Sequence, residues 1–129
     1  MNRVKEIDPK AVVNAVFDAI DEKKGNDIKI LEFNPELTSI CDYFVIAHGE
    51  SERQVKAIAE NVEYRLRKGM GVRPVHTEGT DTANWIVIDY LDVIVHLFTE
   101  EARKFYAIEN LWADAEIYTE PMEISNNEN

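Results

Sequence analysis

The chain has 129 residues, and its 25 acidic against 14 basic side chains give it a net charge of −11 at pH 7. The length fits one domain, the 45% hydrophobic content is typical of a globular protein, and the acidity disfavours DNA and other phosphate backbones as direct partners. No apolar run reaches the roughly 20 residues that span a bilayer, and the single cysteine, Cys41, excludes an internal disulfide, so we expect a cytoplasmic protein without membrane association.

The first predicted element is a helix over residues 8–24. Asp8 is a suitable N-cap because its carboxylate accepts bonds from free backbone N–H groups, and Pro9 fits the first helical position. Gly25 is expected to take the left-handed conformation that ends a helix. One apolar stripe recurs at helical spacing, made of Val12, Val13, Val16, Phe17 and Ile20.

Two strands and a second helix are predicted next. Residues 28–33 alternate as a strand does, and the nearly continuous apolar run 42–47 is typical of a strand buried on both faces. Ser51 and Gln54 form a capping box, in which each side chain satisfies a backbone donor near the other residue. This box predicts the start of a helix over residues 51–68.

Three short strands are predicted after Gly69 and Gly71, which are expected to close the second helix. They lie near residues 72–78, 85–89 and 93–98, and the last two are close enough to form a hairpin. Strand–helix–strand order with five apolar strands predicts an α/β fold with a single layer of mixed β-sheet flanked by helices.

A final helix is predicted from residue 99 or 100 to about residue 109. The acid-rich segment 116–129 is expected to form a mobile tail, so the predicted division is one α/β domain over residues 1–115 followed by this tail. The apolar side chains on one side of the helix, and two that pack back after it, are Ala102, Phe105, Tyr106, Leu111 and Trp112.

A metal site is one chemistry that the residue types suggest. His76 and Glu78 are two apart, so they point to the same face of a strand, and His96 or His48 would complete a set of zinc or iron ligands. No closely spaced pair of histidines supports this set. Unrelated histidines at strand ends explain the pattern more simply, and we expect no metal or other cofactor.

Nucleotidyl transfer is a second candidate chemistry. Residues 49–51 lie between a strand and a helix N-terminus, where backbone N–H groups receive phosphates, and Asp89 and Asp92 would hold metal ions. Residues three apart on a strand, however, face opposite ways. A capped helix after a tight turn explains residues 49–51 without any ligand.

A cysteine nucleophile is the third candidate. His48 follows Cys41 by seven residues, a spacing that corresponds to no known catalytic geometry. A lone cysteine at the start of a buried strand is usually a small hydrophobic residue. We therefore expect no enzymatic activity.

Trp85 starts a predicted strand after a polar loop, where its indole is expected to be half exposed. In strand alternation Trp85, Val87 and Asp89 share one face, and Tyr90 lies on the opposite one. Tryptophan is favoured at interfaces because it buries a large area at little entropic cost, so this face suits a basic, partly apolar protein surface. The alternative, that Trp85 covers the edge of the core and Asp89 only holds the turn, stays open.

Three stretches, in this order, resemble the signatures of the Iojap-related ribosomal silencing factors. The first is residues 37–47 with 49–55. The second is Glu78-Gly79 followed by residues 85–90 and 92–98, and the third is residues 101–106 with Leu111-Trp112. The sequence departs from the family pattern at Leu91, where the hairpin turn usually has glycine, and at His48, where threonine is commoner.

The resemblance implies a translation repressor that binds the large ribosomal subunit through ribosomal protein number fourteen and sterically blocks joining of the small subunit. It also implies a fold related to nucleotidyltransferases without their working active site, and a homodimer when free. A nucleotidyltransferase-like enzyme and a dimeric scaffold for another partner remain the alternatives. By match to the family hairpin, the expected partner-binding residues are Trp85 first, then Asp89, Tyr90, Asp92 and His96.

Overall fold

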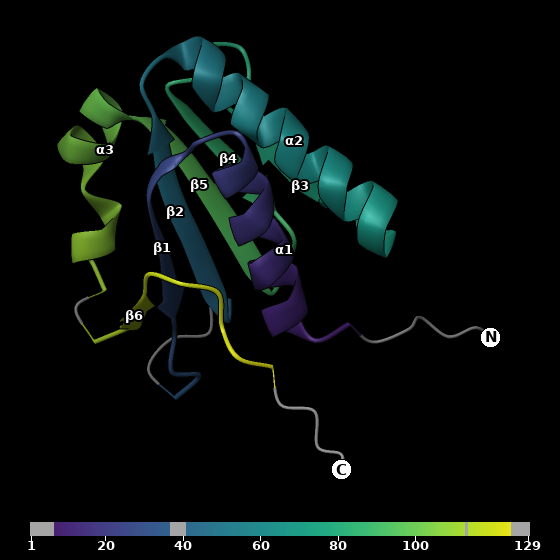
Figure 1. Cartoon of the computed structure of the whole chain (residues 1–129). Helices are drawn as coiled ribbons and strands as arrows, with labels where there is room; N and C mark the ends of the chain where they lie inside the picture. The colour runs from purple at the N-terminus through teal and green to yellow at the C-terminus, as the bar shows by residue number, and fades with distance from the viewer. Residues whose placement is uncertain (1–6, 37–40, 113, 125–129) are drawn as a thin grey trace.

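The computed structural model describes residues 7–36, 41–112 and 114–124, and within them six strands form one mixed sheet in the order β3-β4-β5-β2-β1-β6 (Figure 1). β2 and β5 at its centre are parallel, and every other neighbouring pair is antiparallel. This confirms the predicted α/β fold and mixed sheet. The elements are α1 (Pro9–Glu22), β1 (Asn26–Glu32), β2 (Tyr43–Gly49), α2 (Glu52–Met70), β3 (His76–Glu78), β4 (Trp85–Asp89), β5 (Val93–Thr99), α3 (Glu100–Tyr106), the 3₁₀ helix η1 (Ile108–Asn110) and β6 (Glu116–Tyr118).

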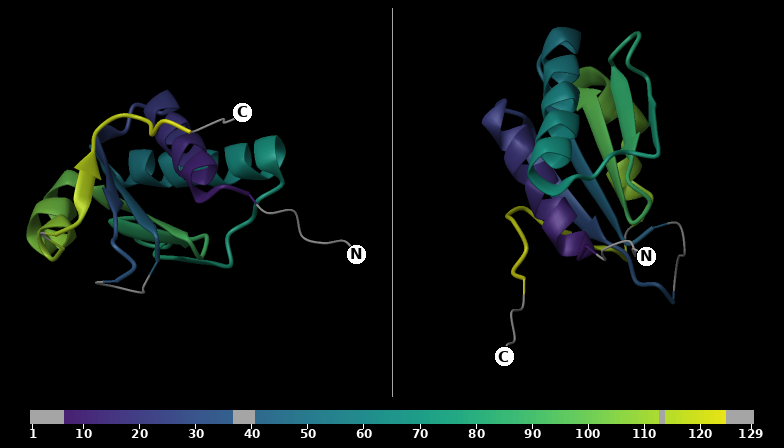
Figure 2. Two further views of the ribbon diagram at one scale, coloured as in Figure 1. Left: turned by 90° about the horizontal axis from the view of Figure 1, so that it is seen from below. Right: turned by 90° about the vertical axis from the view of Figure 1, so that its right-hand side faces the viewer.

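Helices α1 and α2 lie together on one face of the sheet (Figure 2). Their predicted caps are confirmed. The Asp8 carboxylate accepts from Lys10 N, and Ser51 Oγ accepts from Gln54 N. Gln54 Oε1 in turn accepts from Glu50 N at 2.7 Å, which completes the capping box. The larger hydrophobic core lies between these helices and the sheet, with Val13, Val16, Ile20, Ile58, Val62, Leu66, Ile30, Val45, Ile86, Ile88, Val95 and Leu97 among its members.

The opposite face of the sheet is covered by α3, η1 and Trp112, which pack on a smaller core that includes Leu31, Phe44 and Phe98. Toward β4, side chains on this face remain half-buried. We call Trp85, Val87, Asp89 and Ile94 the open face; they project to the same side because Asp89 pairs with Ile94 across the hairpin. In the described part of the chain, no helix combines the length and apolar character needed to cross a membrane.

Glycine positions differ from two predictions. Lys24, not Gly25, takes the left-handed conformation after α1, with φ of 63°. Gly25 is needed for another reason, because a Cβ there would lie 2.3 Å from Ile20 Cγ2. Gly69 lies inside α2, and Gly71 alone ends that helix in the left-handed conformation.

The predicted bounds near the last strands and helix are also corrected. Only residues 76–78 of the predicted strand 72–78 pair with β4. The predicted helix 99–109 breaks at Ala107, which has φ of 46°, so α3 and η1 are separate. Phe105, within α3, faces solvent and is 80% exposed, and Leu111 is also exposed instead of packing back.

The C-terminal segment is part of the fold. β6 pairs antiparallel with β1, and Met122 is buried in the larger core. The Asn14 amide holds this segment on α1, accepting from Met122 N and donating to Met122 O at 2.7 Å each. The predicted tail outside the domain is therefore wrong for residues 116–122, while residues 125–129 lie outside the described part of the chain.

The β4–β5 turn places Leu91 in the left-handed region, with φ of 75°, and leaves its side chain 64% exposed. The departure from the family's glycine thus falls where glycine is favoured. Leu91→Gly is expected to stabilise the fold by about 0.5–1 kcal/mol, because left-handed backbone costs a non-glycine residue about 1–2 kcal/mol and glycine's freedom in the unfolded chain offsets part of this.

Urea unfolding of the parent protein, Leu91→Gly and Leu91→Ala tests this expectation. Alanine keeps the Cβ and should remain within about 0.5 kcal/mol of the parent. A glycine variant no more stable than the alanine variant would contradict strain at this turn.

Candidate protein-binding site

Trp85 lies at the edge of an aromatic cluster on the second face of the sheet. Its Nε1 donates to His96 Nδ1 at 3.2 Å. Its ring stacks on Phe98, with centroids 5.0 Å apart, and lies 4.6 Å from the ring of Tyr106 on α3. Trp85 therefore combines the two roles that the sequence left open: it covers the core edge and keeps part of its indole exposed in a fixed orientation.

His96 accepts the hydrogen bond of the Trp85 indole and is only 7% exposed. Because Nδ1 accepts from the indole, the neutral ring carries its proton on Nε2, which has no hydrogen-bond partner among the described residues. The ring of Phe44 packs edge-on against it at 4.4 Å. Burial lowers the pKa of His96 to about 4, so the ring is neutral at pH 7 and orients Trp85.

Stability is expected to fall at acid pH because of His96. The pKa of His96 in the folded protein, about 4, lies below its ordinary value of 6.5. Its contribution to the free energy of unfolding is therefore complete above pH 6.5 and is lost as the pH falls toward 4. The loss amounts to roughly 3 kcal/mol. His96→Gln offers the indole an acceptor without titrating, so its free energy of unfolding should fall less between about pH 7 and about pH 4. Parallel curves for the two proteins would contradict this role.

The acids of the hairpin lie at one end of the open face. Asp89 Oδ1 accepts from Leu91 N at 2.7 Å, so Asp89 holds the turn while remaining half-buried. The Asp92 carbonyl accepts from Asp42 N at 3.0 Å, and burial together with the charge of Asp92 raises the pKa of Asp42. These three acids give this end of the face a negative charge.

Tyr90 is not brought to this surface. Its side chain is buried in the core between the sheet and helices α1 and α2, opposite to Trp85. Of the five sequence-predicted residues, Trp85, Asp89 and His96 share one face and Asp92 is exposed at its end. Tyr90 and His96 are both too buried for direct contact with a partner in this conformation.

The structure places the two parts of the hypothetical nucleotidyl-transfer site, the phosphate-binding backbone and the metal-binding carboxylates, far apart. Asp92 directly precedes β5. Residues 49–51 lie at the C-terminal end of β2, which pairs with the C-terminal end of β5 through Gly49 and Thr99. Along a seven-residue strand, the two ends are about 20 Å apart. Phosphate-binding backbone and metal-binding carboxylates therefore do not meet.

The other two chemical hypotheses find no support in the geometry. His76 and Glu78 do contact each other, at 2.6 Å, but no group of three or more metal-binding side chains occurs in residues 7–36, 41–112 and 114–124. Burial, together with nearby aspartates, raises the pKa of the Cys41 thiol to about 12, which opposes formation of a thiolate. His48 lies at the other end of β2 from Cys41.

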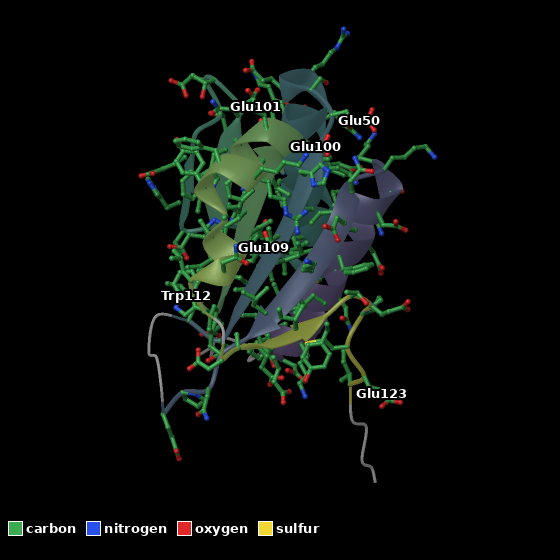
Figure 3. All side chains as sticks on the ribbon, turned by 90° about the vertical axis from the view of Figure 1, so that its left-hand side faces the viewer. Glu50, Glu100, Glu101, Glu109, Trp112 and Glu123 are labelled. Carbon is green, nitrogen blue, oxygen red and sulfur yellow. The ribbon has the colours of Figure 1, made fainter. Side chains whose placement is uncertain are left out.

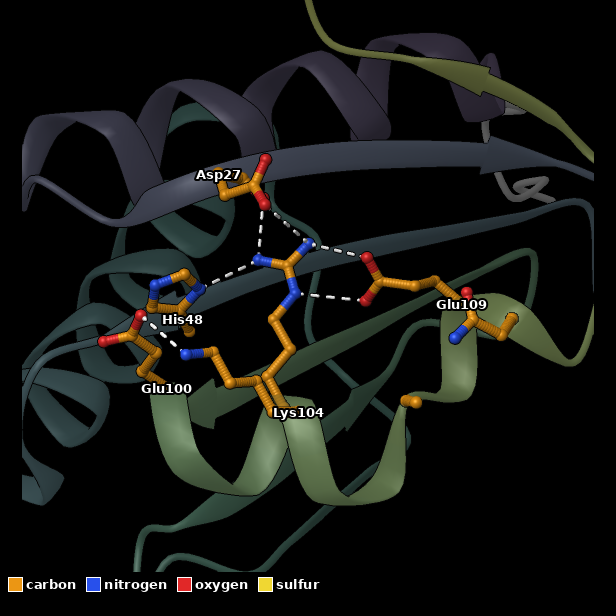
Figure 4. A pocket seen from close by; sticks show the side chains of 8 residues that line it. Asp27, His48, Glu100, Lys104 and Glu109 are labelled. Atoms are coloured by element: carbon orange, nitrogen blue, oxygen red, sulfur yellow. Dashed lines mark hydrogen bonds and ion pairs between the residues drawn. The ribbon is translucent and has the colours of Figure 1, made fainter.

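Arg103, which the sequence did not single out, anchors α3 to the sheet. Its guanidinium binds Glu109 through Nε and Nη2 and donates from Nη1 to the Asp27 carbonyl at 2.8 Å and to His48 Nδ1 at 3.0 Å (Figure 4). Burial opposes ionisation of Glu109, but Arg103 and Lys29 lower its pKa overall. Burial and the charge of Arg103 lower the pKa of His48. The network lines an open pocket of about 390 Å³ and fixes the helix that presents Tyr106 to Trp85.

Arg103→Leu is expected to destabilise the fold by about 3 kcal/mol, because it leaves the carboxylate of Glu109 largely buried without its main partner. The double variant Arg103→Leu/Glu109→Leu removes both charges and should recover much of that loss. Denaturant unfolding of the two variants measures both effects. A double variant less stable than Arg103→Leu would contradict the importance of the unpaired charge.

Comparison with known proteins shows which family this chain resembles. Residues 6–129 match the family model described as "Ribosomal silencing factor during starvation". A ribosomal silencing factor of Bacillus subtilis is 36% identical over 106 residues, which make up 82% of this chain and 88% of that protein.

Two further similarities extend the comparison. A crystal structure of a Chromobacterium violaceum protein superposes with a TM-score of 0.78 at 35% sequence identity, covering 82% of this chain and 87% of that chain. A mouse protein named "Mitochondrial assembly of ribosomal large subunit protein 1" is 29% identical over 108 residues, which cover 82% of this chain and 47% of that protein.

Proposed function

Because the chain belongs to the ribosomal silencing factor family, we propose that it is a translation repressor that binds the large ribosomal subunit and hinders joining of the small subunit. The half-buried indole of Trp85, held by His96 on the same face of the sheet as Asp89 of the hairpin, is the observation that carries the proposed docking site. The name of the mouse relative, which refers to assembly of the large subunit, supports that choice of subunit.

The partner surface on the ribosome is a basic protein rather than RNA. The chain carries a net charge of −11, which repels phosphate backbones and attracts lysine and arginine side chains. Ribosomal protein number fourteen is the contact that the family signatures imply. Trp85 and Val87 would bury against its apolar surface, while Asp89 and Asp92 face its basic side chains.

The proposed mechanism is steric and requires no catalysis. A bound domain prevents subunit joining by occupying the joining surface, so the effect depends on affinity and concentration alone. Trp85 suits an anchor because its ring is already ordered by Phe98 and Tyr106, so that little conformational entropy is lost on binding. We extend the proposal to a cytoplasmic homodimer in the free state.

Trp85→Ala is expected to weaken binding to isolated large subunits by about 2 kcal/mol, roughly thirtyfold, because it removes the central anchor. It also disturbs the aromatic cluster. Val87→Arg is therefore the second variant: it adds bulk and positive charge to the open face while keeping Trp85 itself, and it should weaken binding at least as much.

Co-sedimentation with large subunits measures both variants, with Tyr64→Ala on α2 as the control on another surface. Adding small subunits then tests the mechanism, since joined ribosomes should decrease as the parent protein increases. If folded Val87→Arg binds as tightly as the parent, the open face is not the docking site. If the parent binds but joining is unchanged, steric exclusion is wrong.

A further inference from the structure

An uncovered aromatic surface on α3 borders a groove at the end of the sheet opposite to the hairpin acids. Phe105 is 80% exposed and packs edge-on against Tyr106, with ring centroids 5.0 Å apart. The groove has a volume of about 610 Å³ and is lined by both rings and by four glutamates, Glu50, Glu52, Glu100 and Glu101. Figure 3 shows Glu50, Glu100 and Glu101 gathered at this end of the molecule.

The groove is continuous with the open face. Tyr106 lines the groove and also lies 4.6 Å from the ring of Trp85. Asn84, which directly precedes Trp85, lines the groove as well. A partner segment that covers Trp85 therefore reaches the ring of Tyr106 and then that of Phe105 without a break in the surface.

The charge of the groove selects the class of partner. Glu100 pairs with Lys104 at 3.6 Å, and within the described residues Glu50, Glu52 and Glu101 form no ion pair. A phosphate backbone is repelled by four carboxylates, and a second copy of this acidic chain would bring like charge to the groove. Arginine and lysine suit both the aromatic rings and the glutamates of the groove, because their stems pack on an aromatic ring while their charges meet carboxylates.

We propose that the groove binds a basic segment of the same protein partner that docks on the open face, with an arginine or lysine side chain lying over Phe105 and its charge among the four glutamates. This inference rests on the proposed function for the identity of the complex. It adds a second contact region outside the hairpin residues, and it assigns a role to a large apolar side chain left exposed on a short helix.

Two variants of exposed residues test the groove without disturbing the core. Phe105→Ser should weaken co-sedimentation with large subunits about tenfold. Glu52→Gln/Glu101→Gln should weaken it about tenfold at low salt and much less at about 0.5 M salt, because screening suppresses exposed charge interactions. The matched controls, Tyr64→Ser and Glu60→Gln on α2, remove an exposed aromatic ring and an exposed acid elsewhere and should change binding less than twofold.

Titration of the isotope-labelled protein with the amidated peptide Arg-Leu-Arg-Leu-Arg, followed by NMR, separates failure of the groove from failure of the proposed function. Amide shifts should concentrate around Phe105 and disappear in Phe105→Ser. If the parent binds large subunits but the groove variants bind equally well, the groove inference is overturned and the proposed function stands. If large subunits are not bound while the peptide still binds in the groove, the proposed function fails, and a basic protein partner other than the ribosome is supported. Peptide shifts spread over all acidic surfaces would overturn the groove as a specific site.

Discussion

β2 and β5 pair in parallel along their whole length, from Tyr43 opposite Val93 to Gly49 opposite Thr99, and the other features of the molecule follow from this pairing. Parallel neighbours need a crossover connection, here supplied by α2, β3 and β4. The crossover places α2 on one face of the sheet and leaves β4 on the outer side of β5, where Trp85 and Val87 remain half exposed.

The same pairing distributes charge over the two ends of the strands. Asp42 and Asp92 meet where β2 and β5 begin, and the glutamates of the groove meet where they end. Between them lies the aromatic cluster around Trp85. An acidic surface that includes an ordered tryptophan is suited to a basic protein and poorly suited to nucleic acid, which agrees with a ribosomal protein as the proposed contact.

The proposed docking surface depends on the position of α3. Arg103 fixes this helix to β1 and β2, and Tyr106 on the helix packs against Trp85. The buried ion pair contributes little net stability compared with apolar packing, but it restricts the orientation of the helix. Loss of this ion pair would therefore disturb the proposed docking surface even in a protein that remains folded.

Local physical chemistry in the sequence determined the helix caps at Asp8 and Ser51, the two-sided burial of β2 and the hairpin, each of which depends on residues close together in the chain. The family was indicated by three separated signatures between residues 37 and 112. Only the tertiary structure decided that Arg103 binds Glu109, because a continuous helix over 99–109 would place residues six apart on different sides, and the break at Ala107 brings them together. Strand alternation already placed Tyr90 opposite to Trp85, but only the tertiary structure decided that His96 orients Trp85 and that β6 completes the sheet. These contacts join residues that are distant in sequence or whose direction depends on the sheet, and neither periodicity nor spacing encodes them.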